Sequence, residues 1–208
     1  MPAPNSRPTS DLTGLTNLSG LSVSAPSRNI RLIVIHCSAS PNERTLFSGK
    51  YGTPGFVDPV HEIDAWHKQR GFQRDTYWRG RMNSTLQAIG YHFVIARNGA
   101  AFSGRHEGEI GAHAAGWNRS SLGICLVGTD KFSELQWLAL KATVTGLAKR
   151  LDIPLSPPDL MVQGKQGVVV SRGICGHRDL PGHNKTCPGF DVAAWLADDM
   201  NTQPEAME

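Results

Sequence analysis

Apolar residues gather in short runs that predict buried strands. The run Leu-Ile-Val-Ile at 32–35 lacks polar alternation, which is typical of a strand covered on both faces. Asn98-Gly99 is a hairpin signal, so the chain after it is expected to return antiparallel. In chain order, the predicted strands cover residues 31–37, 89–97, 100–104, 121–127 and 168–175.

Helix signals separate these strands. Asp58 followed by Pro59 is typical of an N-cap and a first-turn proline, and it predicts a helix that runs to Gly71. Ser133-Glu-Leu-Gln136 has the form of a capping box, and the apolar spacing after it predicts a second helix to about residue 151. A short helix is expected over 191–200. Interleaved strands and helices predict one α/β domain with a central mixed sheet covered by helices.

The composition of the two chain ends differs from that of the middle and predicts the domain boundaries. Residues 1–28 are rich in Ser, Pro, Asn, Thr and Gly and are expected to form a flexible arm, residues 29–200 the domain, and residues 201–208 a frayed tail. The N-terminus has no charged start followed by an apolar stretch, and no run approaches about 18 apolar residues. A cytoplasmic protein without a signal peptide or a membrane-spanning segment is therefore expected.

The charge and the cysteine content limit which classes of protein this chain can belong to. The 21 Lys and Arg residues nearly balance the 18 Asp and Glu residues, and the formal charge of +3 argues against a nucleic-acid binder. This surface is compatible with a polyanionic partner such as a bacterial cell wall. Four cysteines are too few for a disulfide scaffold in 208 residues, so free thiols with one metal ligand are expected.

Histidine and cysteine positions suggest a metal site. His36 closes the first predicted strand, and the Gly/Pro-rich segment 175–190 contains His177 and Cys187, ten residues apart. A loop of that length can present both side chains to one ion, with His36 as a third ligand. Zinc prefers such ligands, and a catalytic zinc keeps one open position. Spacing alone supports a metal site and a structural loop equally, because no CxxC-type motif is present.

Six sequence blocks appear along the chain in a fixed order. They are HCSAS (36–40), AWHKQRGF (65–72), IGYHFVIARNG (89–99), GAHAAGWN (111–118), SLGICLVG (121–128) and GHRDLPGHNKTCPGFD (176–191). Together they resemble one known family, the zinc-dependent N-acetylmuramoyl-L-alanine amidases, which includes phage endolysins, bacterial wall-recycling amidases and peptidoglycan recognition proteins. The resemblance spans about residues 31 to 197 and implies a zinc site in a groove at the sheet edge.

The resemblance assigns roles to matching residues. It implies that His36, His177 and Cys187 bind Zn²⁺, and that Tyr91 and Lys185 serve catalysis. Zinc lowers the pKa of a bound water to about 7, which supplies hydroxide near neutral pH. A fixed cation and a phenol can stabilise the oxyanion that forms when an amide is attacked. Taken without the resemblance, the tyrosine reads as a packing aromatic and the lysine as a solvated loop residue.

Other residues near these motifs receive weaker assignments. His113 and Asn118 are expected to line the substrate groove, although either could order its own loop instead. His183 lies between two implied ligands but does not match the ligand position of the family. The segment 72–88 looks longer than in compact phage members and carries Arg74 and other arginines and aromatics, so we hypothesise that it borders the groove.

The function implied is hydrolysis of the amide bond between N-acetylmuramic acid and L-alanine in bacterial peptidoglycan. A monomeric phage or prophage endolysin that acts on the periplasmic wall after release is expected. A cytosolic muropeptide-recycling amidase is an alternative, and so is a non-catalytic peptidoglycan-binding module. Binding-only relatives typically lack the cysteine ligand, so Cys187 favours an enzyme. A regulatory role through a polymerase is a further alternative, which nothing in residues 1–28 favours.

Overall fold

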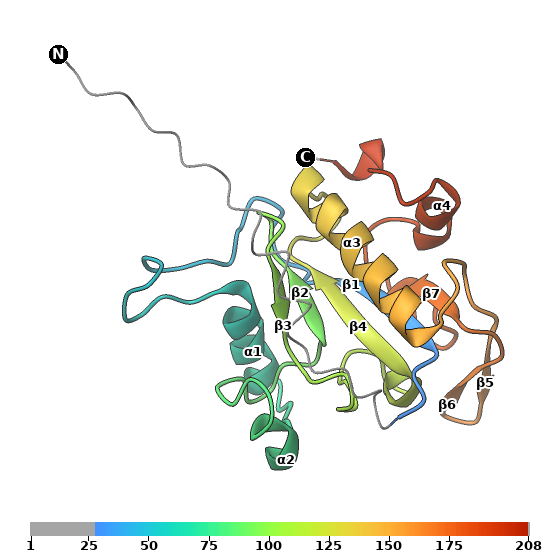
Figure 1. Ribbon diagram of the computed structural model, residues 1–208, viewed down its shortest axis with the longest axis horizontal. Coiled ribbons are helices and arrows are strands. Elements are labelled where there is room, and N and C mark those ends of the chain that lie inside the picture. The colour runs from blue at the N-terminus through green and yellow to red at the C-terminus, as the bar shows by residue number, and fades with distance from the viewer. Residues whose placement is uncertain (1–27, 208) are drawn as a thin grey trace.

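The core of the protein is a five-stranded mixed sheet. The computed structural model describes residues 28–207 (Figure 1). The strand order is β3-β2-β4-β1-β7, and all neighbours are parallel except the β2–β3 hairpin. The hairpin confirms the turn expected at Asn98-Gly99. The strands are β1 (Leu32–Cys37), β2 (Phe93–Ile95), β3 (Ala101–Ser103), β4 (Ser121–Leu126) and β7 (Gly173–Gly176).

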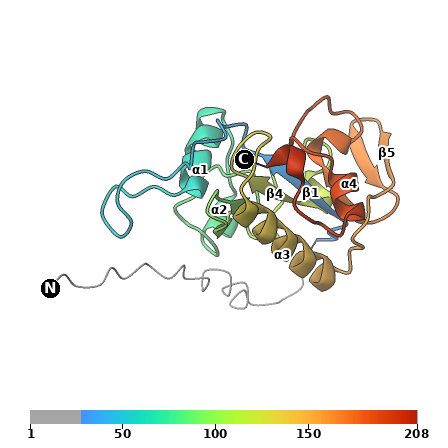
Figure 2. The same ribbon diagram turned by 90° about the horizontal axis from the view of Figure 1, so that it is seen from above.

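Helices cover both faces of the sheet, which confirms the α/β class (Figures 1 and 2). One face packs against α3 and α4 through a core that includes Trp137 and Trp195. On the opposite face α1 packs on the β2–β4 side, and Trp117 with its loop packs on the β1–β7 side. The helices are α1 (Pro59–Gln69), α2 (Thr76–Arg79), α3 (Glu134–Leu151) and α4 (Val192–Ala197).

The two predicted helix starts are confirmed. The side chain of Asp58 accepts a hydrogen bond from the backbone N–H of His61, with Pro59 in the first turn of α1. Ser133 and Gln136 form a reciprocal capping box at the start of α3. Each cap satisfies backbone donors that a helix terminus leaves without partners.

The predicted strand over 168–175 is wrong as a single element. The first part of that range belongs to strand β6 (Gln166–Val169), which pairs antiparallel with β5 (Leu160–Gln163) in a separate two-stranded sheet. The chain then crosses to β7 in the main sheet. The hairpin packs on the 111–118 loop, where the backbone N–H of Gly167 donates to the Gly116 carbonyl. A side chain at Gly167 would clash with the Trp117 ring, because its Cβ would lie 2.2 Å from that indole.

The chain ends differ from expectation where they are described. Nearly all of the expected arm lies outside residues 28–207, but Arg28 belongs to the domain and donates hydrogen bonds to the carbonyls of Glu107 and Ser121. Residues 201–207 are not frayed, since Ala206 is buried and its carbonyl accepts from the Phe132 N–H. Among the described residues, no helix combines the length and apolar character needed to cross a membrane.

Candidate metal centre and active site

Parallel pairing of β1 and β7 brings two histidines together. Ile35 is opposite Gly176 in this pair, so the next residues, His36 within β1 and His177 directly after β7, lie at the same level of the sheet. Their ring centroids lie 4.6 Å apart. The backbone N–H of Gly176 donates to Asp179 Oδ2 at 2.7 Å, which fixes the 3₁₀ turn that carries His177.

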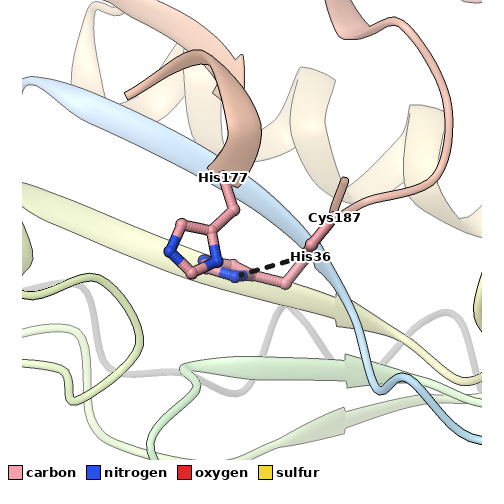
Figure 3. Close-up of side chains that lie close together, drawn as sticks. All are labelled: His36, His177 and Cys187. Carbon is pink, nitrogen blue, oxygen red and sulfur yellow. Dashed lines mark hydrogen bonds between the residues drawn. The ribbon is translucent and has the colours of Figure 1, made fainter. Parts of the chain in front are cut away.

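Cys187 completes a three-residue cluster from a separate loop. Its Sγ lies 3.8 Å from His36 Nδ1, and it accepts a hydrogen bond of 3.2 Å from the backbone N–H of Cys37. One potential ligand atom from each of His36, His177 and Cys187 lies within 4.8 Å of the other two (Figure 3). Within residues 28–207 this is the one group of three or more His, Cys, Asp or Glu side chains placed to hold a metal ion. The structure thus brings together the three residues implied as ligands.

The electrostatics of the cluster suit a cation. Burial, followed by the neighbouring His113 and His177, holds the pKa of His36 well below its usual value. Burial, with His183 and Lys185, lowers the pKa of His177 to about 4. Both rings are therefore neutral near pH 7 and keep a lone pair for a metal.

The thiol of Cys187 is the member of the cluster that has to ionise. Its hydrogen bond with the Cys37 side chain, together with burial, raises the pKa of Cys187 well above that of a free thiol. Zinc is bound by thiolate, and a bound divalent cation deprotonates a coordinating thiol. A donor set of two imidazoles and one sulfur fits zinc, with a fourth position left open.

Tyr91 lies beside this cluster. Its ring centroid is 5.1 Å from that of His36 and 5.3 Å from that of His67. Burial, followed by the nearby thiols of Cys125 and Cys187, raises the pKa of the Tyr91 phenol well above 10, so the hydroxyl stays protonated and can donate.

Lys185 is exposed, two residues before Cys187 on the same loop. Its charge acts on the cluster, because it contributes to the lowered pKa of His177. Lys185 therefore lies close enough to affect His177 electrostatically, while its side chain is exposed to solvent.

His113 and Asn118 are arranged differently from a simple groove lining. Nδ1 of His113 lies 3.0 Å from Nε2 of His36, and its own Nε2 is buried without a hydrogen-bond partner among the described residues. The side-chain oxygen of Asn118 accepts from the backbone N–H groups of His113 and Ala114, both at 2.9 Å. Asn118 therefore orders its own loop, the alternative left open by the sequence, and sequence reasoning missed the contact between His113 and His36.

In the segment 72–88, the first arginine is buried inside the protein. Arg74 is buried and forms an ion pair with Glu109 at 2.8 Å, and it also donates to backbone carbonyls within the segment. Arg74 is therefore not available to a substrate, contrary to that part of the hypothesis. Trp78 stacks on His106 at a centroid distance of 5.0 Å.

The remaining histidines near the site have structural partners. His67 accepts a hydrogen bond from the Gly90 N–H, and His92 accepts one from the Gly123 N–H; both side chains are buried. His183 is not part of the three-residue cluster, but its Nδ1 lies 3.1 Å from Nε2 of His177. Sequence reasoning missed this contact, because no pattern along the chain shows which loop residue folds back over another.

Comparisons with known proteins agree with this geometry. The family model for N-acetylmuramoyl-L-alanine amidase matches residues 26–190. The chain is 31% identical over 179 residues to the endolysin of Enterobacteria phage T3, covering 82% of this chain and 87% of that protein. It is also 31% identical over 172 residues to the endolysin of Escherichia phage T7, covering 78% and 83%.

A solved structure shows the same fold. The N-acetylmuramoyl-L-alanine amidase LysC from Clostridium intestinale URNW superposes with a TM-score of 0.54 at 22% identity, covering 85% of this chain and 88% of that one. The family match covers well over half of the 208 residues. The chain belongs to the N-acetylmuramoyl-L-alanine amidase family.

Proposed function

We propose that this chain is a zinc-dependent peptidoglycan amidase that works as a phage or prophage endolysin. Membership of the family gives the reaction, hydrolysis of the amide bond between N-acetylmuramic acid and L-alanine. The observation that carries zinc dependence is the convergence of His36, His177 and Cys187, whose potential ligand atoms lie within 4.8 Å of one another.

The three residues would hold the ion in a fixed frame. His36 lies in β1 and His177 follows β7 directly, so both backbones are anchored to the sheet, and the Cys37 N–H donates a hydrogen bond to the Cys187 sulfur. When bound, zinc would supply a Lewis acid and a water of pKa about 7. A rigid frame matters because ligands set by strands are held more precisely than ligands on loops.

We assign Tyr91 and Lys185 to stabilisation of the reacting carbonyl. The Tyr91 hydroxyl remains protonated and the Tyr91 ring lies beside that of His36, so the hydroxyl is suited to donate a hydrogen bond to an oxyanion. The exposed side chain of Lys185 adds a positive charge whose field reaches His177. The protonated Tyr91 hydroxyl is also able to transfer its proton to the leaving amine. Contact of His113 with substrate remains a prediction.

The endolysin role rests on two phage relatives that the chain matches over most of their length. The chain matches more than four-fifths of each of these two endolysins at 31% identity. An endolysin acts on the cell wall after release, so we propose the periplasmic wall as its place of action and peptidoglycan as its partner. A recycling amidase would instead require small soluble muropeptides.

A digestion assay tests the proposal. Purified peptidoglycan is scored for newly freed L-alanine amino groups and for new reducing sugar ends, with the protein as prepared, after chelation and after zinc is restored. We expect new amino groups without reducing ends, loss on chelation and recovery with zinc. The Cys187→Ala variant should be inactive in every arm, whereas Cys175→Ala, which alters a buried thiol outside the cluster, should remain active.

Three other results would contradict parts of this account. Activity that survives complete chelation would exclude zinc dependence. Cleavage of soluble anhydro-muropeptides without cleavage of intact wall would replace the endolysin role with recycling. Binding of the wall with no cleavage of either substrate would show that the protein is a non-catalytic peptidoglycan-binding module.

A further inference from the structure

A tight turn brings His183 back over His177. The backbone N–H of His183 donates to the Leu180 carbonyl at 3.1 Å, with Pro181 at the second position of the turn. Gly182, at the third position, has φ of +86°, which a type II turn requires and which favours glycine. Leu180 is buried in the core and anchors the turn. As a result the rings of His183 and His177 lie 4.9 Å apart.

Hydrogen bonds use both nitrogens of the His183 ring. Nε2 lies 3.0 Å from the carbonyl oxygen of Ala115, and Nδ1 lies 3.1 Å from Nε2 of His177. A carbonyl can only accept, so the proton of a neutral His183 ring belongs on Nε2, and its Nδ1 must accept. His177 is then the donor through Nε2, and its lone pair lies on Nδ1. These protons are assigned from the partners of each nitrogen.

We propose that His183 is a positioning residue for metal binding, one that fixes His177 in the tautomer whose Nδ1 binds the ion. This inference rests on the proposed zinc function. A ligating histidine commonly donates its other N–H to a carboxylate, a carbonyl or water, which sets the ring orientation and raises the basicity of the ligand. Here a second imidazole takes that place.

The same contact connects two loops of the site. Ala115 belongs to the loop that carries His113 and Asn118, and Asn118 holds the backbone of that loop through the 113 and 114 N–H groups. The hydrogen bonds therefore run from the 111–118 loop through His183 to His177. His113 supports His36 from the other side of the cluster, so each candidate histidine ligand has an imidazole on its second nitrogen.

Two substitutions separate the hydrogen bond from simple packing. His183→Phe keeps a ring of similar size but removes the acceptor. His183→Asn keeps an oxygen close to the Nδ1 position and loses the ring. His61→Phe is a matched control, because His61 also uses both ring nitrogens, on Asp58 and Thr85, but lies on α1 and is partly exposed.

Two measurements are made on each full-length protein. Competition with a chromogenic chelator at fixed pH gives the zinc dissociation constant. The ¹⁵N chemical shifts of the His177 ring in the zinc-free protein report its tautomer without any metal. We expect His183→Phe to weaken zinc binding by about 10- to 100-fold, and to leave His177 in a mixture of tautomers. His183→Asn should restore most of the affinity, and His61→Phe should match the wild type.

The outcomes distinguish this inference from the zinc proposal. If the wild type binds no zinc but its His177 is fixed with the proton on Nε2, the zinc proposal fails and the tautomer assignment stands. If the wild type binds zinc and His183→Phe binds it equally well, the role of His183 is refuted. Equal losses in His183→Phe and His183→Asn would also refute it, because packing rather than the acceptor would then be responsible.

Discussion

Nε2 of His36 lies 3.0 Å from Nδ1 of His113, so the His113 imidazole forms a hydrogen bond with the candidate metal ligand His36. The His113 ring in turn packs against strand β4 at Gly123, which has no side chain. A Cβ built on Gly123 would lie 2.7 Å from Cγ and Cδ2 of that ring. The absence of a side chain on β4 therefore determines where His113 lies, and through it the orientation of His36.

Gly123→Ala should accordingly disturb the site as well as the core. Forcing a methyl group into this contact costs about 1–3 kcal/mol in the free energy of unfolding, and the His113 ring has to move away from His36. We expect a lower urea midpoint and weaker zinc binding. The control is Gly146→Ala in α3, where nothing lies within 4 Å of the added Cβ. This substitution should stabilise the protein by about 0.5–1 kcal/mol. Equal behaviour of the two variants would contradict the packing argument.

Lys185→Ala should separate catalysis from metal binding. The side chain is exposed and is not a candidate ligand, so zinc affinity and stability should not change. Loss of one oxyanion-stabilising group typically lowers kcat by about 100- to 1000-fold. Steady-state hydrolysis of a soluble muropeptide measures this change, with Lys165→Ala in the exposed β5–β6 turn as a control. A wild-type kcat in Lys185→Ala would exclude the proposed role.

Removal of one partner from the buried ion pair between Arg74 and Glu109 should strongly destabilise the fold. Glu109 is almost fully buried and also contacts Arg105 at 3.3 Å. Glu109→Gln leaves buried guanidinium charge without its partner, which costs about 3–5 kcal/mol. Glu62→Gln breaks an exposed pair with Arg44 and should cost no more than about 1 kcal/mol. Chemical denaturation of the two variants gives the comparison, and similar losses would contradict the burial argument.

His67 should make the fold sensitive to acid. Burial, followed by the nearby Arg70, lowers the pKa of His67 from 6.5 to about 4. Between these values the unfolded chain binds the proton and the folded protein does not, so stability is retained above pH 6.5 and falls as the pH decreases toward 4. The full effect is about 3 kcal/mol.

The pH profile of unfolding measures this contribution. His67→Asn keeps an acceptor for the Gly90 N–H but cannot titrate. Its free energy of unfolding should therefore depend less steeply on pH between 6.5 and 4 than that of the wild type. Parallel profiles for the two proteins would show that His67 is not responsible.

Local signals predicted much of the fold. The capping residues Asp58 and Ser133 determine where α1 and α3 begin, and each satisfies helix donors within a few residues in sequence. The apolar run of β1 is buried on both faces, as its sequence indicates. The hairpin over β5 and β6 was missed because both strands are only four residues long and β5, which follows two prolines, is largely exposed and carries no strand pattern.

The site could be predicted only in part. The resemblance to a family identified the cluster of His36, His177 and Cys187, which lie far apart in sequence. The contacts of His113 and His183 depend on how two loops fold over the sheet, and on the turn at Gly182. Such contacts arise from tertiary packing, so neither periodicity nor spacing along the chain reveals them.

X-ray absorption at the zinc edge tests the central claim most directly, because it identifies the atoms around the ion. For the zinc-loaded protein, the account predicts one sulfur at about 2.3 Å and nitrogen or oxygen ligands at about 2.0–2.1 Å. The sulfur contribution should disappear in Cys187→Ala and remain in Cys175→Ala. A spectrum without sulfur, or one unchanged in Cys187→Ala, would contradict a metal centre built from His36, His177 and Cys187.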